Sequence, residues 1–221
     1  MIIQLNNNYI SSTIKPEGFS DFMDKVFSSL EKEINLVADT FYKYDPEEHL
    51  NHYGKDDIFT IIERTWIGLF NNAILRAFPN TATMQEFSVW SETKAVGRCD
   101  LLFNYRYNGK EYDVISEAKS YEFTDDWNKT DSLQFYKPIL EQAEKYHLLE
   151  RKYYTRPVVL MIIVFEWIRD TTKLERATSI MKKWTAQSDS ETDFVALYTG
   201  ESRGLFVYGK TKVIDIKSSV T

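Results

Sequence analysis

The sequence predicts an α/β fold in which helices flank a mixed central sheet. Three observations predict this class: apolar residues recur at helical spacing over 16–79, alternation with a period of two follows over 84–119, and a buried apolar run at 158–165 comes after a further helix. A buried strand that is reached through a helix after a three-stranded meander implies a mixed sheet with helices packed on it.

The first two predicted elements are helices. Apolar residues at spacings of three and four predict a helix over about 16–41, and residues 44–57 are polar enough to form a loop. A second apolar stripe predicts a helix over about 58–78, which ends at a Pro-Asn pair. The stripe residues are Phe19, Phe22, Met23, Val26, Phe27, Leu30 and Ile34 in the first helix, and Phe59, Ile62, Trp66, Leu69, Phe70 and Ala73 in the second.

Strands dominate the middle of the chain. Alternating β-branched and aromatic residues predict strands over 84–90 and 96–107, and a third strand over 111–119 follows a turn. Helical spacing returns at 132–153. The run at 158–167 then has the composition of a strand that is buried on both faces.

The C-terminal part adds a helix over 172–185 and two short strands, over 194–199 and 205–216. No repeat or Pro/Gly/Ser-rich linker interrupts the chain, so residues 1–221 are expected to form a single domain. Its expected parts are a core at 58–170, an N-terminal helical extension at 1–57, and a C-terminal helix with strands at 171–221.

Composition and charge exclude several classes of protein. Hydrophobic residues make up 43% and charged residues 27% of the chain, which disfavours disorder and fibrous repeats, and the one cysteine excludes an internal disulfide and a multi-cysteine metal site. The net charge of -6 argues against a generally basic nucleic-acid coat. Three asparagines at 6–8 disfavour a secretory signal, and the run at 158–165 is too short for a membrane span of about 20 residues. We therefore expect a cytoplasmic protein that contacts no membrane.

The Asn-Gly pair at 108–109 is a strong hairpin signal, because a type I′ turn needs positive φ at both central residues. The turn fixes the register of both flanking strands. Arg106 then faces Glu111, a charge-matched pair of the kind that stabilises neighbouring strands. Further along the same ladder, Asp100 lies directly opposite Glu117.

In that register Asp100 and Glu117 repel each other. Opposed residues have Cβ atoms about 4.5–5.5 Å apart, and two carboxylates at ~5 Å repel by roughly 3 kcal/mol at an effective dielectric constant of about 20. A raised pKa, the neighbouring Lys119 and Arg98, or a bound cation would compensate. A hard divalent ion is the natural partner of two convergent carboxylates, and a salt-bridged, solvated face is the alternative.

The tetrapeptide Gly-Arg-Cys-Asp at 97–100, followed on the next strand by Glu-Ala-Lys at 117–119, resembles the motif of the PD-(D/E)XK nuclease superfamily. The restriction-endonuclease-like core of that superfamily, with the order αβββαβ, matches the predicted elements of residues 58–170. Cys99 stands where the family name has a proline.

Two helical features extend the resemblance. Gln142 and Tyr146 are similar to the Gln-x-x-x-Tyr signature of the RecB-like branch, and residues four apart share a helix face. Family members also tend to carry a glutamate on the helix before the sheet, and Glu63 occupies that place. An ion pair with Arg64 or Lys119 is the alternative for this acid.

The resemblance implies an Mg²⁺-dependent nuclease that hydrolyses phosphodiester bonds of single- or double-stranded DNA in restriction, repair or defence, with Mn²⁺ as a substitute for Mg²⁺. It implies that Lys119 acts on the attacking water and offsets transition-state charge, that Gln142 orients the metal shell or the substrate, and that Tyr146 contacts the DNA strand. The implied metal ligands are Asp100, Glu117, the backbone carbonyl of Ala118, and Glu63.

The alternative is a nuclease-fold protein that no longer cuts and serves as a binding or assembly module. Loss of an acid or of the lysine would mark such a protein. Asp100, Glu117 and Lys119 are all present, which favours the enzyme. Because the chain is acidic, a homodimer or a partner subunit is expected to assist DNA binding, and the basic residues at 173–183 and 203–212 are candidates for a DNA-facing surface.

Overall fold

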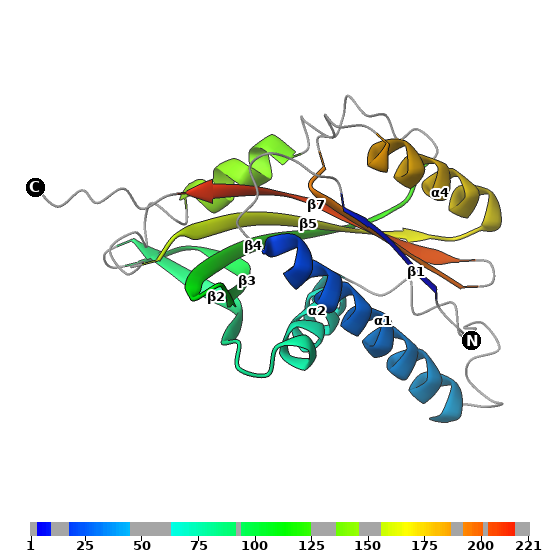
Figure 1. Ribbon diagram of the computed structural model, residues 1–221, viewed down its shortest axis with the longest axis horizontal. Helices are drawn as coiled ribbons and strands as arrows, with labels where there is room; N and C mark the ends of the chain where they lie inside the picture. Colours follow the sequence, from blue (N-terminus) through cyan, green and yellow to red (C-terminus); the bar gives the residue numbers. More distant parts are fainter. Residues whose placement is uncertain are drawn as a thin grey trace, which may run out of the picture.

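The computed structural model describes residues 4–9, 18–44, 63–91, 94–124, 136–145, 156–186, 192–200 and 203–214. The strands among them are β1 (Gln4–Tyr9), β2 (Thr83–Ser91), β3 (Lys94–Tyr107), β4 (Lys110–Glu122), β5 (Val158–Ile168), β6 (Phe194–Thr199) and β7 (Gly204–Ile214). They form one mixed sheet of seven strands in the order β1-β6-β7-β5-β4-β3-β2, in which the β4–β5 pairing is parallel. The chain is therefore an α/β fold with helices on both faces of the sheet (Figure 1).

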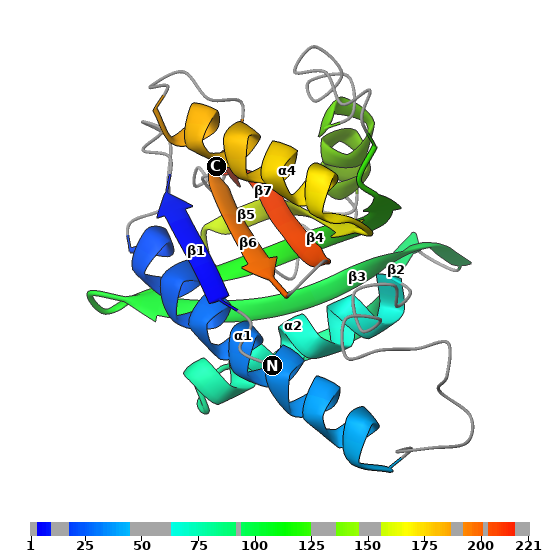
Figure 2. The same cartoon turned by 90° about the vertical axis from the view of Figure 1, so that its right-hand side faces the viewer.

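One face of the sheet carries α1 (Phe19–Tyr44) and α2 (Glu63–Ala77), as Figure 2 shows. The apolar stripe predicted for α1 is buried, and so are the described members of the stripe predicted for α2. The indole of Trp66 stacks on the ring of Phe165 in β5, with centroids 6.0 Å apart. The Tyr198 hydroxyl donates to the carbonyl oxygen of Phe27 at 3.1 Å, which ties α1 to β6.

The opposite face carries α4 (Thr171–Thr185) and the helix of residues 136–145 (Figures 1 and 2). Strand β5 lies between the two layers and is buried on both faces, which confirms the interpretation of its apolar run. None of the helices in the described part of the chain is long and apolar enough to cross a membrane.

The predicted elements that fall on described residues are confirmed, with ends that shift by a few residues. The N-terminal extension needs a correction, because residues 4–9 form an edge strand, antiparallel to β6, that was not predicted. Three consecutive asparagines conceal this strand, since asparagine is depleted in strands. Apart from Tyr44, which ends α1, the predicted loop at 44–57 lies outside the described residues.

Gly209 in β7 occupies a position at which a larger residue does not fit. A Cβ atom there would lie 2.1 Å from the carbonyl oxygen of Ile162 and 2.2 Å from the ring of Phe194. Gly209→Ala is therefore expected to destabilise the protein by about 3 kcal/mol, because β7 is paired on both sides and cannot yield freely.

The matched control is Gly68→Ala on α2, where a Cβ atom meets nothing within 4 Å. Alanine is favoured over glycine inside a helix, so this variant is expected to gain up to ~1 kcal/mol. Urea unfolding measures both free energies. Equal stability of the two variants would show that β7 relaxes around the added methyl group.

Candidate active site

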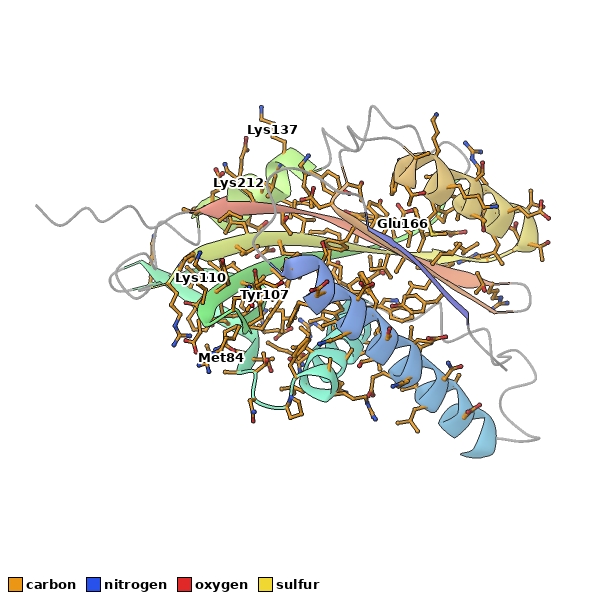
Figure 3. The ribbon with its side chains drawn as sticks, in the orientation of Figure 1. Met84, Tyr107, Lys110, Lys137, Glu166 and Lys212 are labelled. Atoms are coloured by element: carbon orange, nitrogen blue, oxygen red, sulfur yellow. The ribbon has the colours of Figure 1, made fainter. Side chains whose placement is uncertain are left out.

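The hairpin between β3 and β4 has the predicted register. Asn108 and Gly109 both have positive φ, 48° and 79°, as a type I′ turn requires. Arg106 pairs with Glu111 in the ladder, and their side chains form an ion pair. Figure 3 shows Tyr107 and Lys110 at this end of the sheet. The turn chemistry was therefore sufficient to align the two strands over their first seven pairs.

The two strands separate where the ladder was expected to continue. The last β3–β4 pair is Leu101 with Ser116, and Asp100 is not a ladder partner of Glu117. Beyond this point β4 goes on pairing with β5, and β3 goes on pairing with β2. Extending the same register would set Arg98 opposite Lys119, but Arg98 has its ladder partner, Ser88, on β2. We call this divergence of β3 and β4 the fork.

Acidic side chains replace the missing strand partner at the fork. The Ala118 N–H donates to Oδ2 of Asp100 at 2.8 Å, and the Ser120 N–H donates to Oε2 of Glu63 at 3.1 Å. Alternate residues of a strand direct their N–H groups toward the same neighbour, so these two groups are the ones that β3 leaves when it diverges. Divergence thus draws one carboxylate from β3 and one from α2 to the edge of β4.

Glu117 is the most perturbed acid at the fork. Its side chain is 1% exposed, and Oε2 accepts a hydrogen bond from Nε2 of Gln142 at 2.9 Å. Its other oxygen, Oε1, is buried and accepts no hydrogen bond from the residues that the structure describes. Burial, and next the negative charge of Asp100, raise the pKa of Glu117 from 4.5 to about 8, while Lys119 acts in the opposite direction and Glu63 adds to the rise.

Lys119 places its ammonium group at the same fork. Nζ donates to the carbonyl oxygen of Ala118 at 2.7 Å, and the side chain is half-buried. The backbone of Ala118 therefore donates its N–H to the Asp100 carboxylate and accepts from the Lys119 ammonium group at its carbonyl oxygen. This carbonyl is the one that the nuclease resemblance assigns to the metal.

The donor set of the fork suits a divalent ion. Once Glu117 is ionised, its buried carboxylate, the carboxylate of Asp100 beside it and a backbone carbonyl are hard oxygen ligands of the kind that Mg²⁺ accepts along with water. Within the described residues, no group of three or more His, Cys, Asp or Glu side chains is spaced to hold a metal ion. In the described part of the chain Glu63 therefore does not complete a group of three acidic ligands with Asp100 and Glu117.

The fork brings together most of the residues that the sequence pointed to. Asp100, Glu117, Lys119 and Glu63 meet there, and Gln142 reaches Glu117 from the opposite helical layer. In the described part of the chain, no ion pair joins Glu63 to Arg64 or to Lys119, which were the alternative partners. Tyr146 lies outside the described residues.

Cys99 is buried beside the site and is chemically unreactive. Burial, followed by the charge of Glu117, raises the pKa of its thiol to about 12. Strand alternation places Cys99 on the same face as Leu101 and Phe103, but the thiol packs in a different cluster with Ile115 and Ala143. The alternation of β3 is therefore interrupted at Asp100, where the strands diverge.

Sequence reasoning missed the partner of Arg64 at this site. Its guanidinium Nε lies 3.2 Å from Oε1 of Glu86, an acid on β2 that the motif does not include. The same glutamate accepts from Nη1 of Arg98 at 2.7 Å. Neither spacing nor periodicity links α2, β2 and β3 in this way, so the sequence carries no signal that could have found the contact.

A scan against protein-family models finds no family that matches the chain, and searches of curated proteins and of solved structures find no match either. The resemblance to the nuclease superfamily therefore depends on the motif residues and on their arrangement at the fork.

Proposed function

We propose that this chain is an Mg²⁺-dependent deoxyribonuclease of the PD-(D/E)XK kind, which hydrolyses phosphodiester bonds of DNA. The observation that carries the proposal is the state of Glu117. A fully buried acid whose pKa is raised to about 8, by burial and then by the charge of the adjacent Asp100 carboxylate, is costly in a protein that only has to fold, because its ionised form is disfavoured there. Such unfavourable groups are common in active sites, because a bound cation or substrate stabilises them.

Each residue at the fork has a role in this chemistry. Asp100, Glu117 and the carbonyl of Ala118 would hold the ion, and Glu63 adds a third negative charge to the fork. The ion supplies Lewis acidity toward the phosphodiester.

The side chains around these ligands fix them and act on the substrate. Gln142 donates to Glu117 and so orients one carboxylate oxygen, as an outer partner of a metal ligand does. Lys119 provides a positive charge for the phosphate oxygens as charge develops on them, and its ammonium group orients the attacking water. In-line attack on the phosphorus atom would displace the 3′ oxygen and leave a 5′ phosphate, as the resemblance implies.

The test of the proposal is cleavage of labelled single- and double-stranded DNA by the wild-type chain. We expect cleavage in Mg²⁺ or Mn²⁺ and none in EDTA, with 5′-phosphorylated products. Calorimetric titration with MgCl₂ reports metal binding independently of cleavage. Absence of both cleavage and metal binding would reject the nuclease and leave the catalytically inactive binding or assembly module as the function.

A further inference from the structure

Two exposed arginines flank the fork, and one glutamate bridges them. Oε1 of Glu86 lies 3.2 Å from Nε of Arg64, and its Oε2 lies 2.7 Å from Nη1 of Arg98. The arginine side chains are 71% and 53% exposed. Exposed ion pairs of this kind contribute little to stability, so the arrangement needs another explanation. We call these three residues the arginine bridge.

The backbone of Glu86 is strained in a way that serves this bridge. Its φ is 49°, a left-handed value that residues with a side chain rarely adopt. Gln85 and Phe87 pair with Leu101 and Cys99, but Glu86 itself drops out of the β2–β3 ladder at the level of Asp100. Glu86 therefore leaves the ladder beside Asp100, the candidate metal ligand. Its carboxylate contacts both Arg64 and Arg98 there.

The arginine bridge adjoins the acids of the fork. Arg64 follows Glu63 on α2, and Arg98 lies two residues before Asp100 on β3, about 7 Å along the strand. Each guanidinium carries five N–H donors, of which Glu86 engages one nitrogen on each arginine. Both arginine side chains are more than half exposed, and the planar array of donors on a guanidinium group matches the oxygens of a phosphate.

The net charge of the site also supports a role for the two arginines in binding a polyanion. When every group is ionised, as metal binding requires of Glu117, the acids of the fork and the bridge are Asp100, Glu117, Glu63 and Glu86 and the cations are Lys119, Arg64 and Arg98, which sum to one net negative charge. A divalent ion would make the fork singly positive. Without the two arginines the metal-loaded fork would be negative, and it would repel a polyanion instead of attracting it.

From this arrangement we infer that Arg64 and Arg98, spaced by Glu86, bind a backbone phosphate of DNA next to the scissile one. The inference rests on the proposed function, because it names the part of the substrate that the same site holds. Phosphate contacts carry no base sequence, so this grip is expected to be independent of sequence. It also gives an acidic chain a local means of binding nucleic acid.

The experiment is fluorescence anisotropy with labelled phosphorothioate DNA, which keeps the backbone charge and resists hydrolysis, in Mg²⁺ and at several salt concentrations. Arg64→Ala and Arg98→Ala are each expected to weaken binding about tenfold on all sequences, and each to lower the slope of log affinity against log salt by about 0.7 on single strands or 0.9 on duplexes. Single- and double-stranded probes are compared in separate arms.

Two controls separate phosphate contact from structural effects. Arg106→Ala removes an arginine on β3 that is as exposed as Arg64 and is also paired with a glutamate, Glu111 of β4, and it should leave affinity and salt slope unchanged. Glu86→Gln breaks both ion pairs, and with them the spacing of the arginines, but keeps both positive charges, so it is expected to weaken DNA binding less than either arginine variant does. A loss of affinity in Glu86→Gln equal to that in Arg64→Ala would overturn the inference.

The outcomes distinguish this inference from the proposed function. If the wild type cleaves DNA but the arginine variants bind like the wild type, the arginine bridge is overturned and the nuclease stands. If the wild type cleaves no DNA but its binding depends on both arginines, phosphate binding by the arginine bridge is supported and nuclease activity is rejected. A wild type that binds neither probe would overturn both.

Discussion

Lys119→Ala is expected to lower the single-turnover rate of Mg²⁺-dependent DNA cleavage by about 10²–10⁴-fold. The ammonium group lies at the fork on the carbonyl oxygen of Ala118. In the proposed reaction it would offset negative charge on the reacting phosphate from there. Removal of a group that stabilises transition-state charge or assists proton transfer typically costs this much. Because the side chain is only half-buried, the fold should survive the change.

Asp100→Asn gives the matching test for the acids. The amide oxygen of asparagine can still accept from the Ala118 N–H, so the edge of β4 stays satisfied while the negative charge is lost. We expect at least a tenfold loss of Mg²⁺ affinity by calorimetry and a comparable loss of cleavage. Asp100→Ala removes the hydrogen bond as well, and any further loss of stability in that variant measures the structural share of the residue.

Lys110→Ala is the matched control for both variants. This exposed lysine lies at the start of the same strand, next to the turn and away from the fork (Figure 3). It should cleave DNA at the wild-type rate. If Lys119→Ala and Asp100→Asn cleave as fast as Lys110→Ala, the cleavage comes from a contaminating nuclease and the proposed site is wrong.

The sequence was sufficient for the parts of the site that depend on local chemistry. The Asn-Gly turn determines its own dihedral angles, and those angles align β3 with β4 up to Leu101. Helical spacing likewise places Gln142 on the side of its helix that meets the sheet, although only the family resemblance gave a reason to single it out.

The sequence could not show where β3 and β4 part. A turn shows how two strands are aligned but not how far along the chain they stay paired. The point of divergence depends on the other strands with which β3 and β4 pair. Asp100 was therefore predicted to face Glu117, but in the structure it accepts from Ala118 N–H. The left-handed φ of Glu86 is equally invisible, since nothing about a glutamate favours that conformation.

These two failures occur at the same place. At the fork, the register and the backbone conformation that the local sequence favours differ from those in the folded chain. Such differences are expected at functional sites, where residues are not optimised for stability. The cost at Glu117 can be measured directly, because its pKa differs between the folded and unfolded chain.

Glu117→Gln is expected to abolish cleavage and, in the metal-free protein, to increase stability. The pKa of Glu117 is about 8 in the folded chain, against an ordinary value of 4.5. As pH rises above 4.5 the unfolded chain loses this proton first, which favours unfolding. The free energy of unfolding therefore falls between about pH 4.5 and pH 8 and then levels off, and a shift of this size corresponds to at most about 5 kcal/mol.

Glutamine has no proton to lose and its amide can donate toward Asp100, so the variant should escape this decline. Urea unfolding of both proteins in EDTA at pH 5 and pH 8.5 measures the difference, which should be small at pH 5 and reach several kcal/mol at pH 8.5. Glu111→Gln on the same strand is the control, because a hydrogen bond with Arg106 lowers the pKa of Glu111, so its contribution to stability is lost only below about pH 4.5 and its difference from the wild type should stay nearly constant between pH 5 and pH 8.5. A difference between wild type and Glu117→Gln that stays constant with pH would mean that Glu117 is charged in the metal-free fold, and the fork would then have no stored cost for a cation to relieve.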